Sequence, residues 1–118
     1  HFDKLFVYAE DRRSIDAFAD EFSEELDFID RRRGFFEILP KGCSKASAME
    51  QIAGILELPM EETVAIGDSS NDVAMLKRAG CSIAMGNGTD EVKALADYVT
   101  ATVEEDGIWK ALGWLGVL

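Results

Sequence analysis

Apolar residues change their spacing along the chain, and the changes predict the secondary structure of its first part. Residues 2–10 are rich in aromatic and β-branched side chains, which is typical of a strand. Ser14 then offers a helix cap, and a stripe at helical spacing follows it. That stripe consists of Ile15, Phe18, Ala19, Phe22 and Leu26. Short apolar runs at 26–30 and 35–39, the second stopped by Pro40, predict two more strands. The pattern therefore predicts a β-α-β-β piece of the α+β kind.

After Pro40 the pattern changes to short strands that alternate with helices. Ser44 is placed to cap a helix, whose expected buried stripe is Ala48, Met49, Ile52, Ile55 and Leu56. Short apolar runs at 63–66 and 81–85 are typical of strands covered on both faces. A third strand is expected at 98–100, and helices are expected at 73–79, after Thr89 and at 104–115, with Gly80 as a left-handed helix end. This alternation predicts an α/β fold with a parallel sheet and helices on both faces.

Charge and composition narrow the classes of function. The chain has 118 residues and a formal net charge of −11, which disfavours binding to nucleic acid. Arg31, Arg32 and Arg33 form a basic cluster, which we interpret as a solvated turn, with an anion site as the alternative. No apolar run is long enough for a membrane span. Two cysteines and no evident signal peptide favour a reduced, cytoplasmic protein.

The sequence Gly67-Asp68-Ser69-Ser70-Asn71-Asp72 follows the strand predicted at 63–66. Ligands of parallel α/β sheets bind where strands end and helices begin. Asp68 and Asp72 are hard oxygen ligands of the kind that Mg²⁺ prefers, and the intervening polar residues suit a phosphate at a helix N-terminus. The alternative is a turn with a helix cap and no ligand, because Asp, Ser and Asn favour such places.

Lys45 lies in the first turn of the helix that Ser44 caps. The helix dipole disfavours a cation at that end, so a lysine there usually has another reason, such as an anion. A solvated surface lysine is the alternative interpretation.

Four stretches together resemble the C-terminal part of the haloacid dehalogenase superfamily, most closely its Cof-type phosphatases. They are FFEILPKGCSKASAM (35–49), TVAIGDSSNDVAMLKRAG (63–80), IAMGNGTDEVKALADYVT (83–100) and EEDGIWKAL (104–112). Residues 2–33 are similar to the last part of the family's cap domain. The resemblance implies a partial cap domain at 1–34 and the second half of a Rossmann-like core at 35–118.

The resemblance also implies roles for individual residues in a Mg²⁺-dependent phosphatase of small phosphorylated metabolites such as sugar phosphates. Lys45 would neutralise the phosphate and the attacking carboxylate, and Asn71 would hydrogen-bond the phosphate. Asp68 would bind Mg²⁺ directly, and Asp72 directly or through water. The runner-up readings are the phosphorylation domain of a P-type ion pump, which has a similar acidic motif, and a non-catalytic regulatory module.

The sequence departs from the family at the nucleophile. The family's Asp-x-Asp motif does not occur in the chain, so we expect a catalytically incomplete fragment that is inactive alone and binds Mg²⁺ weakly. The strand at 63–66 would lack its usual neighbour, and Phe6, Tyr8, Phe18 or Phe22 would be poorly covered. We therefore expect either a homo-oligomer or a missing N-terminal half.

Overall fold

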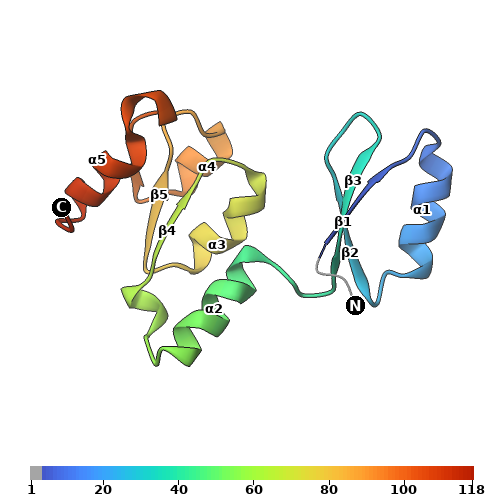
Figure 1. The fold of residues 1–118 in the computed structure, drawn as a ribbon, viewed down its shortest axis with the longest axis horizontal. Coiled ribbons are helices and arrows are strands. Elements are labelled where there is room, and N and C mark those ends of the chain that lie inside the picture. The colour runs from blue at the N-terminus through green and yellow to red at the C-terminus, as the bar shows by residue number, and fades with distance from the viewer. Residues whose placement is uncertain (1–3) are drawn as a thin grey trace. The chain divides into compact units, whose positions relative to one another are not determined.

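The computed structural model describes residues 4–118, which divide into two compact units, one ending at Cys43 and the other beginning at Ser44 (Figure 1). Each unit is built around its own three-stranded sheet. Among the helices of the described residues, none has the length and apolarity that crossing a lipid bilayer requires.

The first unit contains the predicted β-α-β-β order. Its elements are β1 (Leu5–Tyr8), α1 (Arg12–Glu21), β2 (Leu26–Asp30) and β3 (Phe35–Pro40). The strands are antiparallel in the order β1-β3-β2, so β3 is central. The buried side chains of the unit include Ile15 from α1 and Phe36 and Ile38 from β3. The prediction for this part of the chain is confirmed, although residues 2 and 3 lie outside the described residues.

Two details of the first unit differ from the sequence-based expectation. Asp11, not Ser14, caps α1, because its carboxylate accepts a hydrogen bond from the backbone N–H of Arg13 and the helix begins three residues earlier than expected. The unit also extends to Cys43, whereas the predicted boundary followed Gly34. The physical reason is that β3 hydrogen-bonds to both β1 and β2 and so belongs to their sheet.

The second unit contains the predicted parallel α/β arrangement. Its elements are α2 (Lys45–Ile55), β4 (Val64–Gly67), α3 (Val73–Arg78), β5 (Cys81–Ala84), α4 (Asp90–Leu95), β6 (Tyr98–Val99) and α5 (Gly107–Trp114). The strands are parallel in the order β4-β5-β6. Ala65, Leu76, Ala84 and Val92 form the centre of the core, and Met49 of α2 packs against them.

The predicted buried stripe of α2 is wrong in most positions. Ala46 and Ala53 are buried, whereas Ile52, Ile55 and Leu56 are 57%, 80% and 60% exposed. The helix thus packs through small side chains, which allow a close approach, and leaves a larger apolar surface uncovered.

Gly80 does not adopt the left-handed conformation expected of a helix-ending glycine, because its φ is not positive. A Cβ at this position would lie 2.0 Å from the Glu61 carbonyl oxygen. Close approach of two backbone segments, rather than a helix end, therefore requires glycine here.

Candidate active site

The acidic loop after β4 is held by its own hydrogen bonds. Ser70–Asp72 forms a single 3₁₀ turn that leads into α3, and Ser69 and Asp72 form a reciprocal capping box. The backbone N–H of Asp68 and of Ser69 donate to the Asp72 Oδ2 atom over 3.0 and 3.2 Å. The loop thus folds around the Asp72 carboxylate. These hydrogen bonds hold the sharp turn that the chain makes directly after β4.

Lys45 contacts this same carboxylate from α2. Its ammonium Nζ lies 2.5 Å from the Asp72 Oδ1 atom. The Lys45 side chain is 52% exposed, while that of Asp72 is 3% exposed. The ion pair joins the start of α2 to the start of α3, and it accounts for a lysine in the first turn of a helix, where the dipole alone disfavours a cation.

The pKa of Asp72 lies below its ordinary value. Burial by itself raises the pKa of this carboxyl, but the hydrogen bonds from Lys45 and from the backbone N–H of Asp68 and Ser69 outweigh it. Asp72 is consequently a carboxylate at neutral pH, and both of its oxygen atoms already accept hydrogen bonds from the protein.

Asp68 differs from Asp72 in both burial and hydrogen bonding. It is exposed, and within residues 4–118 its carboxylate has no hydrogen-bond or ion-pair partner. Its backbone is nevertheless fixed, because the Thr89 N–H donates to the Asp68 carbonyl oxygen over 3.0 Å. The site therefore presents one uncommitted carboxylate on a rigid backbone.

Gly88 is part of the same support and was not assigned a role from the sequence. A Cβ on this residue would lie 3.2 Å from the Asp68 Cα and 2.9 Å from the Met85 carbonyl oxygen. The turn at 86–88 thus packs directly against the backbone of the acidic loop. In the sequence this turn is marked by Gly86 and Gly88 on either side of Asn87, and Gly86 and Asn87 resemble a loop of the family that supports the site.

Asn71 is half-buried, and its side-chain oxygen accepts a hydrogen bond from the Ser69 hydroxyl. That bond fixes the amide plane, so that the Asn71 NH₂ group remains as a donor. An amide donor on the same loop as Asp72, the partner of the Lys45 ammonium, suits an oxyanion.

The oxygen atoms of the loop can be compared with the ligands that Mg²⁺ takes in proteins. The described part of the chain contains no group of three or more His, Cys, Asp or Glu side chains placed to hold a metal ion. Mg²⁺ does not require such a group, since it commonly takes one or two carboxylates and keeps several waters. Asp68 fits this role through its exposed carboxylate. The oxygens of Asp72 accept hydrogen bonds from Lys45 and the loop, and its binding of Mg²⁺, directly or through water, stays a prediction.

The loop therefore brings together Lys45, Asp72 and the Asp68 backbone by direct hydrogen bonds. On the same loop, the Asp68 carboxylate and the Asn71 amide N–H groups have no protein partners within residues 4–118. A cation on Asp68 and an oxyanion on Lys45 and Asn71 would complement these groups in charge.

Comparison with known proteins identifies the family. A family model of haloacid dehalogenase-like hydrolases matches residues 2–112. A 5-amino-6-(5-phospho-D-ribitylamino)uracil phosphatase of Bacillus subtilis, YitU, is 40% identical over 108 residues, which cover 87% of this chain and 39% of that protein.

Two solved structures resemble the whole chain. A phosphatase of the haloalkanoate (HAD) enzyme superfamily from Bacteroides thetaiotaomicron has a TM-score of 0.84 and 34% identity, over 98% of this chain and 42% of its own. A subclass IIB sugar phosphatase of that superfamily has a TM-score of 0.79 and 29% identity, over 98% and 44%. The chain thus spans less than half the length of these relatives, with coverage of 39%, 42% and 44%. It belongs to the haloacid dehalogenase-like hydrolases.

Proposed function

We propose that this chain is the metal- and phosphate-handling part of a Mg²⁺-dependent phosphatase that acts on small phosphorylated metabolites such as sugar phosphates. The observation that carries the proposal is the Lys45–Asp72 ion pair beside the exposed Asp68 carboxylate, at the end of a parallel strand. The relatives support the substrate class, because one is named for a phosphorylated ribityl compound and one is a sugar phosphatase.

Each residue would have a separate role. Asp68 would hold Mg²⁺, and the metal would supply charge stabilisation to the transferring phosphoryl group. Lys45 would neutralise the phosphoryl oxygens, and Asn71 would donate a hydrogen bond to one of them. Asp72 would keep the Lys45 ammonium in place, since it binds that group from a buried position.

Monoester hydrolysis needs one of the largest accelerations known in enzymology. The family's nucleophile, the first residue of an Asp-x-Asp motif, does not occur among these 118 residues. We therefore expect the 118-residue polypeptide alone to bind Mg²⁺ and phosphate weakly without turning over a phosphomonoester.

Two-dimensional NMR of the ¹⁵N-labelled chain tests the site directly. Addition of Mg²⁺ should shift the amide signals of residues 67–72, and later addition of inorganic phosphate should shift those of residues 45 and 69–72. Asp68→Asn should abolish the Mg²⁺ response. Asp90→Asn, which removes an exposed carboxylate from the first turn of α4, is the control and should leave it intact.

Three outcomes would contradict the proposal: an unchanged Mg²⁺ response in Asp68→Asn, a response centred away from residues 67–72, or equal losses in both variants. Steady phosphomonoester turnover by the wild-type chain, undiminished in Asp68→Asn, would refute both the assigned roles and the expected inactivity.

A further inference from the structure

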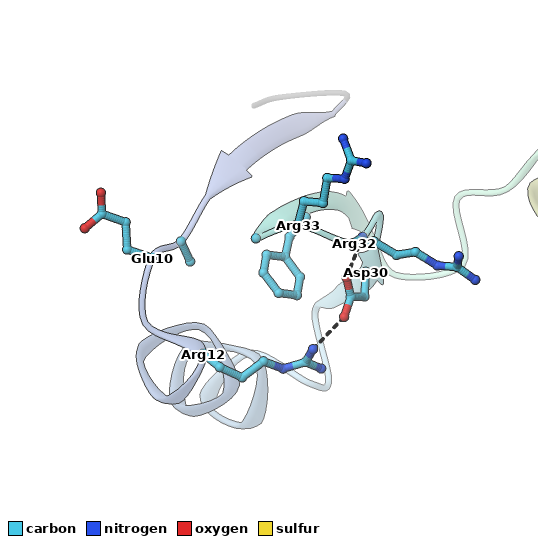
Figure 2. A pocket seen from close by; sticks show the side chains of 8 residues that line it. Glu10, Arg12, Asp30, Arg32 and Arg33 are labelled. Carbon is cyan, nitrogen blue, oxygen red and sulfur yellow. Dashed lines mark hydrogen bonds and ion pairs between the residues drawn. The ribbon is translucent and has the colours of Figure 1, made fainter.

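We propose a second anion site, on the turn between β2 and β3 of the first unit, which binds the phosphate group of a small molecule through Arg32 and Arg33. The site is separate from the proposed active site, because all of its residues precede Cys43. Figure 2 shows the pocket, which has a volume of about 400 Å³. We call it the arginine pocket; it is lined by Ala9, Glu10, Arg12, Asp30, Arg32, Arg33, Gly34 and Phe36.

The backbone of this turn is unfavourable for arginine. Arg32, Arg33 and Gly34 have φ angles of 70°, 54° and 81°, three successive values in the left-handed region. Turns with positive φ at both central positions favour Asn and Gly, since a side chain with a Cβ destabilises that conformation. Two arginines at these positions lower the stability of the turn, and strain of this kind is concentrated at functional sites.

Neighbouring charges do not account for the two arginines. Arg31 pairs with the buried Glu37, and Arg12 pairs with Asp30, its Nη1 atom lying 2.6 Å from Oδ2. The other oxygen of Asp30 accepts the backbone N–H of Arg32 over 2.7 Å. This bond is the main cause that holds the pKa of Asp30 below its ordinary value, and the charge of the Arg32 guanidinium adds to it without a direct hydrogen bond. Within residues 4–118, neither the Arg32 nor the Arg33 guanidinium has a hydrogen-bond or ion-pair partner.

Within residues 4–118, the two carboxylates at the pocket make no direct hydrogen bond or ion pair with the Arg32 and Arg33 guanidinium groups. Asp30 is already bound by Arg12 and the turn, and in Figure 2 the Glu10 side chain is directed away from Asp30 and the arginines. Figure 2 also shows the Arg32 and Arg33 side chains leaving the turn in different directions. Both residues are exposed, and a ligand shared by the two guanidinium groups requires at least one of the side chains to change its rotamer.

The chemistry of the pocket fits a small phosphorylated molecule. Guanidinium groups bind phosphate through paired N–H donors. The volume lies in the range of small-molecule sites, and Phe36, over whose ring the Arg12 guanidinium lies at 5.6 Å from the centroid, adds an apolar wall. The net charge of −11 opposes an anion at long range, so binding should be weak. Salt screens both this repulsion and the attraction between phosphate and the two guanidinium groups.

The test is a titration of the ¹⁵N-labelled chain with inorganic phosphate, compared between wild type and R32N/R33G. Wild type should show saturable shifts of the amides at 9–12 and 30–36, and the double variant should bind at least about tenfold more weakly, which corresponds to the loss of one good charged contact. The melting temperature of the double variant should be equal or higher, because Asn and Gly suit the turn. A merely structural role for the arginines would lower it instead.

A charge-matched control is R13Q/K77Q, which removes two exposed positive charges outside the pocket and should retain saturable binding. If phosphate binding is weakened equally in the control, the effect is one of net charge and the proposal is overturned. Non-saturable shifts in wild type, or unchanged phosphate binding in R32N/R33G, would also overturn it. Lys45→Ala separates the two sites. It should abolish phosphate-induced shifts at 69–72 and leave those at 30–36 in place, so either site can fail without the other.

Discussion

Two carboxylates four positions apart take different roles because one is buried and one is not. Asp72 is 2% exposed and holds together the loop, the start of α3 and Lys45. Asp68 is exposed, and its carboxylate has no hydrogen-bond or ion-pair partner within residues 4–118. Burial therefore distinguishes the two residues, while the binding of Mg²⁺ by Asp68, and by Asp72 directly or through water, stays a prediction.

Asp72→Asn should lower the free energy of unfolding of the second unit by about 2 kcal/mol, in the range for hydrogen bonds to a charged group. The amide can replace only one of the two oxygens that accept N–H groups. Both tryptophans, Trp109 and Trp114, belong to the second unit, so urea unfolding followed by tryptophan fluorescence reports on it. Asp90→Asn is the control for Asp72→Asn. Asp97→Asn is not suitable, because it removes hydrogen bonds to Ser82.

The pH dependence follows from the lowered pKa of Asp72. As pH falls below about 4, the unfolded chain takes up a proton on this carboxyl before the folded chain does. The stabilisation is therefore complete above that range and is lost as the pH falls through the pKa of the folded state. Wild type should lose stability more steeply than Asp72→Asn in acid; parallel curves would show that Asp72 contributes nothing to the acid response.

Gly88→Ala should disturb Asp68 without touching its side chain. The new methyl group would meet the Asp68 backbone and the Met85 carbonyl oxygen at 2.9 to 3.2 Å, so one of the two segments must shift. We expect a weaker Mg²⁺ response of residues 67–72. Gly54→Ala is the matched control, since a Cβ there meets nothing within 4 Å and helix propensity favours alanine; a normal Mg²⁺ response in both variants would contradict the positioning role.

Helix α2 carries Lys45, and its first turn determines where that side chain lies. Ser44 caps the helix, and its hydroxyl and the Ser47 side chain form a reciprocal capping box. The start of the helix is therefore fixed locally, and the Lys45–Asp72 pair then joins it to α3. The first turn of α2 therefore affects both the stability of the second unit and the position of the Lys45 ammonium group.

Ser44→Ala should destabilise the second unit by about 1 kcal/mol, the usual cost of losing such a cap. It should also weaken the phosphate response of residues 69–72, because fraying of the first turn releases Lys45. Ser70→Ala provides a comparison, since the structure assigns the Ser70 side chain no part in the capping box of Ser69 and Asp72. Loss of stability with full retention of the phosphate response would separate the cap from the site.

At the scale of the molecule, the chain has exposed apolar surface in both units. In the first unit Phe6, Tyr8 and Phe35 are 69%, 58% and 51% exposed on the sheet. In the second, β4 has one neighbouring strand, β5, among the described residues, and Val64 is 45% exposed. Unpaired strand edges and open apolar faces favour association with another chain.

We therefore expect the purified chain to self-associate at micromolar concentration, at least in part through the edge of β4. Val64→Lys should shift the mass measured by light scattering toward the monomer, because a lysine on a strand edge opposes further pairing. Lys93→Val leaves this edge unchanged and should not alter the mass. A monomeric wild type would contradict the expectation.

The order of elements and the site loop could be predicted from the sequence, because both depend on local chemistry. The strand before Gly67, the cap at Ser44 and the Lys45 position in the first helical turn are set by neighbouring residues, and the structure confirms these elements. The family followed from four motifs in the right order. These features do not depend on which distant segments pack together.

Contacts between distant segments decided the boundary between the units, the buried face of α2 and the burial of the two carboxylates. Pairing of β3 with two strands placed residues 35–43 in the first unit, and close packing through Ala46 and Ala53 left Ile52 and Ile55 in solvent. Spacing made Asp68 and Asp72 look equivalent, since it carries no information on burial. Only the folded chain, in which Asp72 accepts both Lys45 and the loop N–H groups, distinguishes a carboxylate that holds the site from one that faces solvent.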